Sequence, residues 1–279
     1  MRIETVTSAQ NPKIKNLLLL QEKSRARKEQ GLFVVEGRRE LEHCLAAGFR
    51  VRTLFVCPEV ASSLYGDAAS SLRTAGLLGT SATPACGSAN VIEVPLPLYR
   101  KIAYRDSTEG IIAEVEVRER RLEDLQLPEN PLVVVLEAVE KPGNLGAVLR
   151  SADAAGADAV IVCDPLTDLW NPNLIRASIG AVFTVPTVAA PSAEVIPWLQ
   201  ARGIRILTAQ LQDSEWYYET PMTGPTALVM GTESTGLTDA WREAADAHIR
   251  VPMLGRLDSL NVSVSAAILL FEAVRQRHA

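Results

Sequence analysis

The sequence predicts an α/β protein in which a small α/β domain precedes a larger domain built on a parallel sheet. Short apolar runs alternate with helical patterns along the chain, which is typical of βα units. In the second half the apolar runs are nearly continuous, as expected for strands covered by helices on both faces. A chain of 279 residues is long enough for one or two such domains.

Residues 1–117 are predicted to form the small domain. It should contain a basic helix, a strand with a following helix, and two further strands, at 12–28, 32–47, 51–57 and 110–117. The charged segment 118–130, which includes Pro128, is predicted to be a linker.

Residues 131–279 are predicted to form the larger domain. Its expected strands are 132–136, 159–162, 204–208, 227–230 and 247–251. Its expected helices are 146–155, 174–180, 193–201, 238–244 and 262–277. Ligands of parallel sheets bind beyond the carboxyl ends of the strands, and the unusual segments of this sequence fall at those ends.

The composition narrows the class of protein. No apolar run reaches the roughly 18 to 20 residues of a membrane-spanning helix, and the first residues lack the apolar core of a signal peptide. The cytoplasm is therefore the expected compartment, and no membrane partner is expected. The four cysteines are far apart and form no CxxC pair, which argues against a zinc site and a disulfide scaffold.

The net charge of −5 is unevenly distributed, because residues 1–39 carry nine Lys or Arg against four Glu. Such a basic segment can bind phosphates locally even on an acidic protein. A run of charge is also compatible with an ordinary solvated helix face. Both interpretations stay open on charge alone.

The segment Glu140–Ala157 follows the first apolar run of the larger domain. A Pro-Gly turn leads to Asn144, which is placed like the N-cap of the next helix, and Arg150 then interrupts small and apolar residues. A turn and a cap explain this segment except for Arg150. That exception favours a functional role.

Two further segments follow later strands. Residues 231–236 read GTESTG, with neither GxGxxG nor GxxxxGK[ST] nearby, so a dinucleotide fold and a P-loop lack their phosphate-binding parts. Glu233 in this loop can accept hydrogen bonds from an amine, a hydroxyl or an arginine. Ser259 and Asn261 precede a long helix and, taken alone, read as caps. Three such segments at the strand ends of one sheet predict one site.

In order and spacing, PGNLGAVLRSADAAGA, LVMGTESTGL and IRVPMLGRLDSLNVSVSAAILLFE resemble the motifs of the SpoU (TrmH-like) family of SPOUT RNA 2′-O-ribose methyltransferases. The resemblance covers about residues 131–277. SAQNPKIKNLLLL and FVVEGRRELEHCL resemble the substrate-binding domain of ribosomal RNA members. The resemblance implies a small α/β RNA-binding domain followed by a parallel-sheet domain with a deep α/β trefoil knot, an exception to the rule that chains are unknotted.

The resemblance also implies S-adenosyl-L-methionine as methyl donor, without a metal. The donor would be held near Gly231, Val251, Met253 and Leu260. The polar catalytic positions of the family correspond to Asn144, Arg150, Glu233, Ser259 and Asn261. RNA contacts are expected from Arg176, which matches an arginine of ribosomal RNA members, and from Arg38 and Arg39 of the basic segment. Thr232 and Ser234 depart from the commoner GNEGxGL.

The implied reaction is methyl transfer to a ribose 2′-hydroxyl, most simply of 23S-type ribosomal RNA. Arg150 would hold the hydroxyl and the adjacent phosphate, because a guanidinium keeps its proton too strongly to act as a general base. Asn144 and Ser259 would orient Arg150 and the ribose. Glu233 would orient an arginine or the donor.

Other functions stay open at this point. A transfer RNA methyltransferase would share these motifs, whereas a non-catalytic RNA-binding or ribosome-assembly factor would use the same basic segment and lack donor binding. A nicotinamide enzyme would need the absent glycine fingerprint. The family further implies a homodimer through the carboxyl-terminal helix, where an apolar stripe at helical spacing contains Val264, Ile268, Phe271 and Val274. Core packing is the alternative explanation of that stripe.

Overall fold

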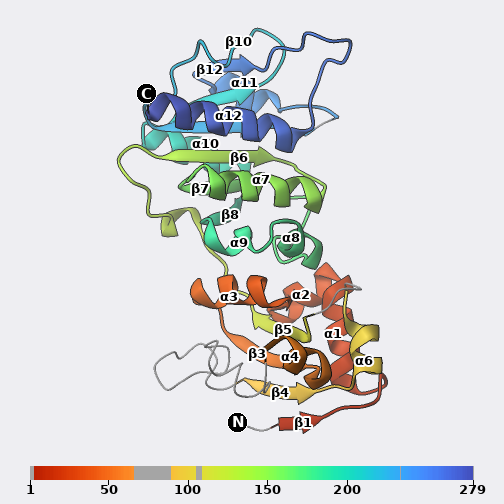
Figure 1. The fold of residues 1–279 in the computed structure, drawn as a ribbon. Helices are drawn as coiled ribbons and strands as arrows, with labels where there is room; N and C mark the ends of the chain where they lie inside the picture. Colours follow the sequence, from red (N-terminus) through yellow and green to blue (C-terminus); the bar gives the residue numbers. More distant parts are fainter. Residues whose placement is uncertain (1–2, 66–88, 105–108, 233, 279) are drawn as a thin grey trace. The chain divides into compact units, whose positions relative to one another are not determined.

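The computed structural model describes residues 3–65, 89–104, 109–232 and 234–278. The chain divides into two compact units. Unit 1 comprises residues 1–118 together with 170–180, and unit 2 comprises residues 119–169 and 181–279. Both are α/β (Figure 1), so the predicted fold class is confirmed. In the described part of the chain no helix is both long and apolar enough to span a membrane.

Unit 1 contains a five-stranded mixed sheet in the order β1-β4-β3-β5-β2. β5 runs antiparallel to β2 and β3, and the other pairs are parallel. The strands are β1 (Ile3–Thr5), β2 (Leu32–Glu36), β3 (Val51–Val56), β4 (Asn90–Glu93) and β5 (Ile111–Glu116). The sequence predicts three of them; β1 and β4 are too short to show a pattern.

The helices of unit 1 are α1 (Pro12–Glu22), α2 (Ser24–Gln30), α3 (Arg38–Ala46), α4 (Pro58–Tyr65), α6 (Leu96–Ile102) and α8 (Pro172–Ala177). The single basic helix predicted at 12–28 is wrong, because Lys23 has extended backbone angles and separates α1 from α2. The buried Arg27 of α2 donates to the carbonyl oxygens of Leu20 at 2.6 Å and Gln21 at 3.3 Å. These bonds satisfy the last carbonyls of α1 and stabilise the break.

Unit 2 contains a seven-stranded sheet in the order β10-β12-β9-β11-β6-β7-β8, in which all pairs are parallel. The strands are β6 (Leu132–Glu137), β7 (Ala159–Cys163), β8 (Thr187–Ala190), β9 (Arg205–Ala209), β10 (Glu215–Trp216), β11 (Thr226–Met230) and β12 (Ala247–Arg250). The five predicted strands are present. The two additional strands, β8 and β10, lie at the edges of the sheet.

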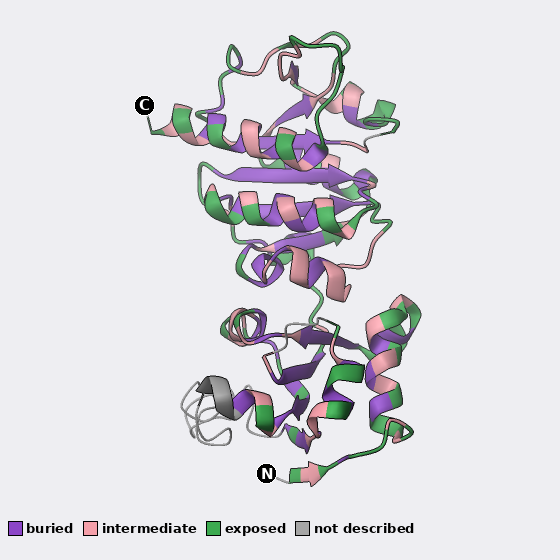
Figure 2. Ribbon diagram, turned by 45° about the vertical axis from the view of Figure 1, so that its right-hand side comes forward, coloured by how far each residue is buried: buried purple, intermediate pink, exposed green. Residues whose placement is uncertain are grey.

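The helices of unit 2 are α7 (Pro142–Ala154), α9 (Ala181–Thr184), α10 (Ser192–Ala201), α11 (Asp239–Ala244) and α12 (Val262–Arg277), with a 3₁₀ turn at Leu122–Asp124. Side chains of α10 and α11, including Trp198 and Trp241, pack on one face of the sheet. α7 and α12 pack against each other on the opposite face (Figure 1). The central strands are buried on both faces (Figure 2), which explains their continuous apolar sequences.

The strand order positions the site. β11 lies between β9 and β6, although it follows both in the sequence. The carboxyl ends of β6, β9, β11 and β12 therefore meet at one edge, and the three unusual segments follow three of these ends. The trefoil knot implied by the family stays a prediction.

Candidate functional site

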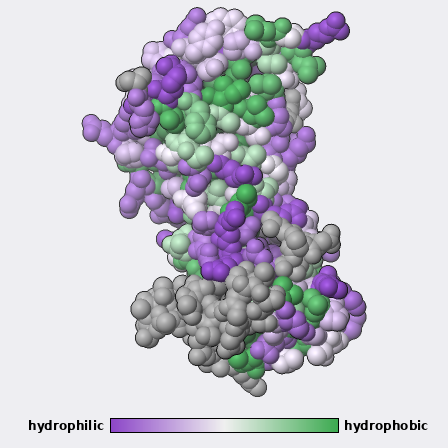
Figure 3. Space-filling model, in the orientation of Figure 1, coloured by the Kyte–Doolittle hydropathy of each residue, from purple (hydrophilic) through white to green (hydrophobic). Residues whose placement is uncertain are grey.

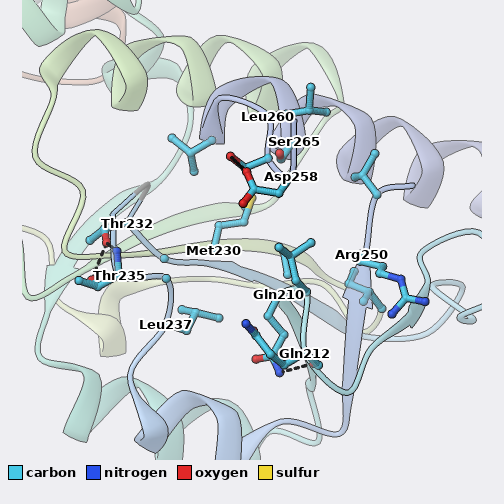
Figure 4. Close-up of a pocket in the computed structure, with 18 of the residues that line it drawn as sticks. Gln210, Gln212, Met230, Thr232, Thr235, Leu237, Arg250, Asp258, Leu260 and Ser265 are labelled. Carbon is cyan, nitrogen blue, oxygen red and sulfur yellow. Dashed lines mark hydrogen bonds between the residues drawn. The ribbon is translucent and has the colours of Figure 1, made fainter. Parts of the chain in front are cut away.

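A cavity of about 670 Å³ lies at the carboxyl ends of β9, β11 and β12 (Figure 4). Its size is within the range of small-molecule sites. The four residues predicted to hold the methyl donor all line it, namely Gly231, Val251, Met253 and Leu260. Ser259 and Asn261 line it as well. The structure therefore brings these six residues, from two separate loops, to one cavity.

The loop after β11 is closed tightly on itself. A Cβ atom on Gly231 would lie 2.3 Å from the carbonyl carbon and oxygen of Gly236, so only glycine fits there. The backbones of Thr232 and Gly236 exchange two hydrogen bonds, at 3.2 and 3.1 Å. Oγ1 of Thr232 also accepts from the backbone N–H of Thr235 at 3.0 Å. The threonine that departs from the family motif thus supplies a side-chain oxygen that holds this turn.

A buried carboxylate anchors the end of the same loop. Glu137, the last residue of β6, is 4% exposed. Its carboxylate accepts from the backbone N–H of Thr238 at 2.9 Å and from the hydroxyl of Thr238 at 2.7 Å. Sequence analysis does not identify Glu137, because its partner is 101 positions away. The contact joins the end of β6 to the end of the loop 231–236, which follows β11.

Asn144 and Asn261 meet at the amino-terminal ends of α7 and α12. Nδ2 of Asn261 donates to Oδ1 of Asn144 at 3.1 Å. Asn261 is the N-cap of α12, where its Oδ1 accepts from the backbone N–H of Ser263 at 2.9 Å. The predicted N-cap position of Asn144 is wrong, because α7 begins at Pro142 and its N-cap is Lys141. A proline is favoured at the first position of a helix, so the helix starts before the asparagine.

A second cavity, of about 220 Å³, adjoins the first. Its own residues are Val139, Glu140 and Lys141, from the segment between β6 and α7, and Asn144 in the first turn of α7. It shares the remaining lining residues with the larger cavity, namely Gly231, Thr232, Ser234 and Val262. The larger and the smaller cavity therefore lie next to each other, and both are lined by residues of the loop that follows β11. Such a pair suits a reaction between two bound molecules.

Arg150 lies on the exposed side of α7 and is not among the described residues that line either cavity. Six residues along an α-helix correspond to about 9 Å and about 240° of rotation, so Arg150 and Asn144 are on different sides of α7. Ser259 is exposed, and its hydroxyl donates to Asp258 at 3.3 Å. Glu233 lies outside the described residues.

The residues predicted to bind RNA lie in unit 1. Arg38 is half-buried and pairs with Glu42 one turn along α3 at 2.5 Å, whereas Arg39 is exposed. The guanidinium of Arg176 lies 4.6 Å from the ring centre of Tyr104, which is partly exposed. A guanidinium over an aromatic ring is a surface on which nucleic-acid bases also stack.

The cysteines of unit 2 and unit 1 offer no nucleophile in the described chain. Burial raises the pKa of the Cys163 thiol to about 12, and the pKa of Cys57 to about 11, so both stay protonated at neutral pH. Cys44 is buried, and Cys86 lies outside the described residues. Among the described residues no group of three or more His, Cys, Asp or Glu is arranged to hold a metal ion.

Other polar residues that the sequence does not single out also line the larger cavity, among them Gln210, Arg242 and Asp258. Gln210 follows directly after β9. Its place at a strand end is a signal that could have identified it, since the other cavity loops also follow strand ends. Arg242 and Asp258 carry no such signal.

Comparisons with known proteins agree with this arrangement. The chain matches the SpoU rRNA Methylase family over residues 131–271 and the MRM3-like substrate binding domain over residues 11–113. It is 32% identical to the 23S rRNA (uridine(2479)-2′-O)-methyltransferase of Streptomyces viridochromogenes over 259 residues, which are 90% of this chain and 85% of the relative.

Two solved structures are similar over nearly the whole chain. A crystal structure of an RNA 2′-O ribose methyltransferase is 38% identical with a TM-score of 0.81, covering 99% of this chain and 100% of the other. An AdoMet-bound rRNA methyltransferase from Sinorhizobium meliloti is 31% identical with a TM-score of 0.83, covering 98% of each chain. The resemblance drawn from the three motifs is thereby confirmed. The chain belongs to the SpoU rRNA Methylase family.

Proposed function

We propose that this protein transfers a methyl group from S-adenosyl-L-methionine to a ribose 2′-hydroxyl of ribosomal RNA. The observation that carries this proposal is the convergence of Gly231, Val251, Met253 and Leu260 on one cavity at the carboxyl edge of the parallel sheet. The name of the Streptomyces viridochromogenes relative gives the same reaction on 23S rRNA, and a relative of known structure is bound to AdoMet.

The larger cavity fits the donor. It combines apolar side chains such as Leu237 and Ile249 with polar residues such as Thr232 and Thr235, as expected for a flat base next to polar groups. The donor supplies an electrophilic methyl group on a sulfonium. The protein would hold the donor and the ribose in line, and such positioning can lower a barrier by roughly 7 to 11 kcal/mol.

The smaller cavity is the proposed ribose site. Asn144 lies in its wall and is oriented by Asn261, so an amide group is held where a ribose hydroxyl could bind. Lys141, also in this wall, would add positive charge beside the adjacent phosphate. Ser259 and Glu233 keep their proposed polar roles.

We propose that Arg150 acts across a homodimer. It is exposed on α7, which packs against α12. On α12, Val264 and Phe271 are 47% and 49% exposed, whereas the core-facing residues are Ala266, Leu269, Leu270 and Ala273. Figure 3 shows apolar side chains gathered on this face of unit 2. A second chain on this face would cover Arg150 and bring it near the partner's ribose site.

The test is methyl transfer from tritiated S-adenosyl-L-methionine to 23S rRNA, 16S rRNA and transfer RNA transcripts, followed by nucleoside mass spectrometry. We expect a 2′-O-methylnucleoside in the 23S transcript. Label in transfer RNA alone would make the protein a transfer RNA enzyme. Failure to bind the donor in calorimetry, with RNA binding intact, would favour a non-catalytic RNA-binding or assembly factor. The cytoplasm stays the proposed compartment.

A further inference from the structure

The larger cavity contains an acceptor oxygen with no partner. Oε1 of Gln210 is buried from solvent and has no hydrogen bond within the described structure. The orientation of the amide is fixed, because its Nε2 donates to the carbonyl oxygen of Gln212 at 2.9 Å (Figure 4). The backbone is fixed too, because the N–H of Gln210 donates to the carbonyl oxygen of Ile249 at 3.0 Å.

A donor group without a partner lines the same cavity. Nε of Arg242, on α11, is also buried and has no hydrogen bond among the described residues. A buried polar atom left without a partner costs roughly 1 to 3 kcal/mol. Two such atoms in the wall of one cavity, one an acceptor and one a donor, indicate that a ligand supplies the missing partners.

The surroundings of Gln210 point to a flat apolar group with one amino donor. Met230, Leu237 and Ile249 line the same cavity as Gln210, and Met230, Leu237 and Gln210 are labelled in Figure 4. Apolar walls fit the faces of a purine. A single fixed carbonyl oxygen fits the exocyclic amino group of adenine and opposes the 6-oxo group of hypoxanthine.

We propose that Gln210 determines the base specificity of the donor site, its Oε1 accepting a hydrogen bond from the 6-amino group of the donor's adenine. The buried Nε–H of Arg242 donates to an acceptor atom of the same adenosine. This inference rests on the proposed function, since it assigns the larger cavity to the donor. It adds a side-chain contact that selects adenine over other purines.

The experiment compares two ligands by calorimetry, S-adenosyl-L-homocysteine and S-inosyl-L-homocysteine, which carries a 6-oxo group in place of the amino group. The wild-type protein should bind the inosyl compound at least about tenfold more weakly, because it places two acceptors against each other. Gln210→Met keeps the length of the side chain and removes the oxygen. This variant should bind the adenosyl compound about tenfold more weakly than the wild type does. The affinities of the two ligands for the variant should differ by about twofold or less.

Gln200→Met is the matched control, since the side chain of Gln200 is exposed on α10 and lines neither cavity. It should discriminate as the wild type does. Equal binding of both ligands by the wild type, or unchanged discrimination in a folded Gln210→Met protein, overturns the inference and leaves the proposed function intact. If the Met variant does not fold, Gln210→Leu provides the same comparison. Failure of the wild type to bind S-adenosyl-L-homocysteine overturns both.

Discussion

Asn261 donates a hydrogen bond to Asn144 across 3.1 Å, although the two residues are 117 positions apart in the sequence. The backbone N–H of Ser263 binds Oδ1 of Asn261, which leaves Nδ2 as the group that faces Asn144. That arrangement in turn requires Asn144 to present its Oδ1. The cap of α12 therefore sets the orientation of an amide on α7 in the wall of the smaller cavity.

Asn261→Asp keeps the N-cap of α12 but removes the hydrogen bond that orients Asn144. A carboxylate still accepts from Ser263 and is favourable at a helix N-terminus, but it has no N–H for Asn144. We expect the free energy of unfolding in urea to be unchanged within about 0.5 kcal/mol. Methyl transfer should fall at least about tenfold. Asn261→Ala should lose activity and also about 1 kcal/mol of stability. Normal turnover of the Asp variant would mean that methyl transfer does not require the orientation of Asn144 by Asn261.

Arg150→Lys keeps the charge but loses the planar fork of donors. We expect methyl transfer to fall by roughly two orders of magnitude, about 2.7 kcal/mol of transition-state stabilisation. Calorimetric donor affinity should stay unchanged, since Arg150 does not line the larger cavity. A loss of donor binding would instead assign Arg150 to the donor site.

A mixture of subunits tests whether Arg150 acts across the dimer. Arg150→Lys and Asn144→Ala proteins should each be inactive alone. After unfolding and refolding together they should recover about a quarter of the wild-type rate, because half of the random dimers are mixed and each has one intact site. No recovery, with mixed dimers present by mass spectrometry, would place Arg150 and Asn144 of one chain in the same site.

Replacing Arg38 and Arg39 with Ala should weaken RNA binding. Each lost phosphate contact should reduce the slope of log affinity against log salt by about 0.7 on single-stranded RNA. Arg39→Ala should give most of the effect, because Arg38 is paired with Glu42. Filter binding at several salt concentrations measures this. Arg202→Ala, an exposed arginine of unit 2, is the control; an equal loss there would mean only a general charge effect.

Phe271→Glu should convert the dimer into a monomer. Phe271 is 49% exposed on α12, while the opposite side of the helix carries the buried residues, so the charge should disrupt an interface without unfolding the chain. Light scattering at micromolar concentration gives the mass. Tyr218→Glu, at 48% exposure, should leave the dimer intact. A monomeric wild type would contradict the proposed interface.

The buried carboxylate of Glu114 should make unit 1 less stable at neutral pH than it would be with an uncharged side chain at this position. Burial raises the pKa of this carboxyl, against hydrogen bonds from Thr53 and Asn16 that lower it. A raised folded-state pKa means that protonation stabilises the fold; this contribution is complete below the unfolded pKa of about 4.3 and is lost as pH rises through the folded pKa. Glu114→Gln should therefore raise the Tm at pH 7.5, with a smaller gain near pH 4.

The exposed Glu116 on the same strand provides the control for this pH series. Glu116→Gln should leave the Tm almost unchanged at both pH values, because substitutions of solvated surface side chains usually change stability by less than about 0.5 kcal/mol. A stabilisation by Glu114→Gln that does not vary with pH would mean that packing, and not ionisation, is responsible.

The types of most elements in unit 2 and the edge of the sheet at which its site lies could be predicted from the amino-acid sequence alone. Continuous apolar runs identify buried parallel strands because burial on both faces is a local property of each run. Segments such as 231–236 and 259–261 could be placed on one edge of the sheet for the same reason, since every parallel strand ends there. Gly231 and Asn261 are recognisable because a tight turn and a helix cap each restrict the residue type.

Which strand ends are neighbours could not be predicted, because it depends on the order of the strands in the folded sheet. β11 lies between β9 and β6, and nothing in the sequence of a strand specifies its partner across the sheet. The hydrogen bonds from Thr238 to Glu137, the contact between Asn261 and Asn144, and the placement of Gln210 in the cavity wall follow from that order. Each depends on residues far apart in the chain, whose distance is fixed by packing and not by the local preferences that a sequence displays.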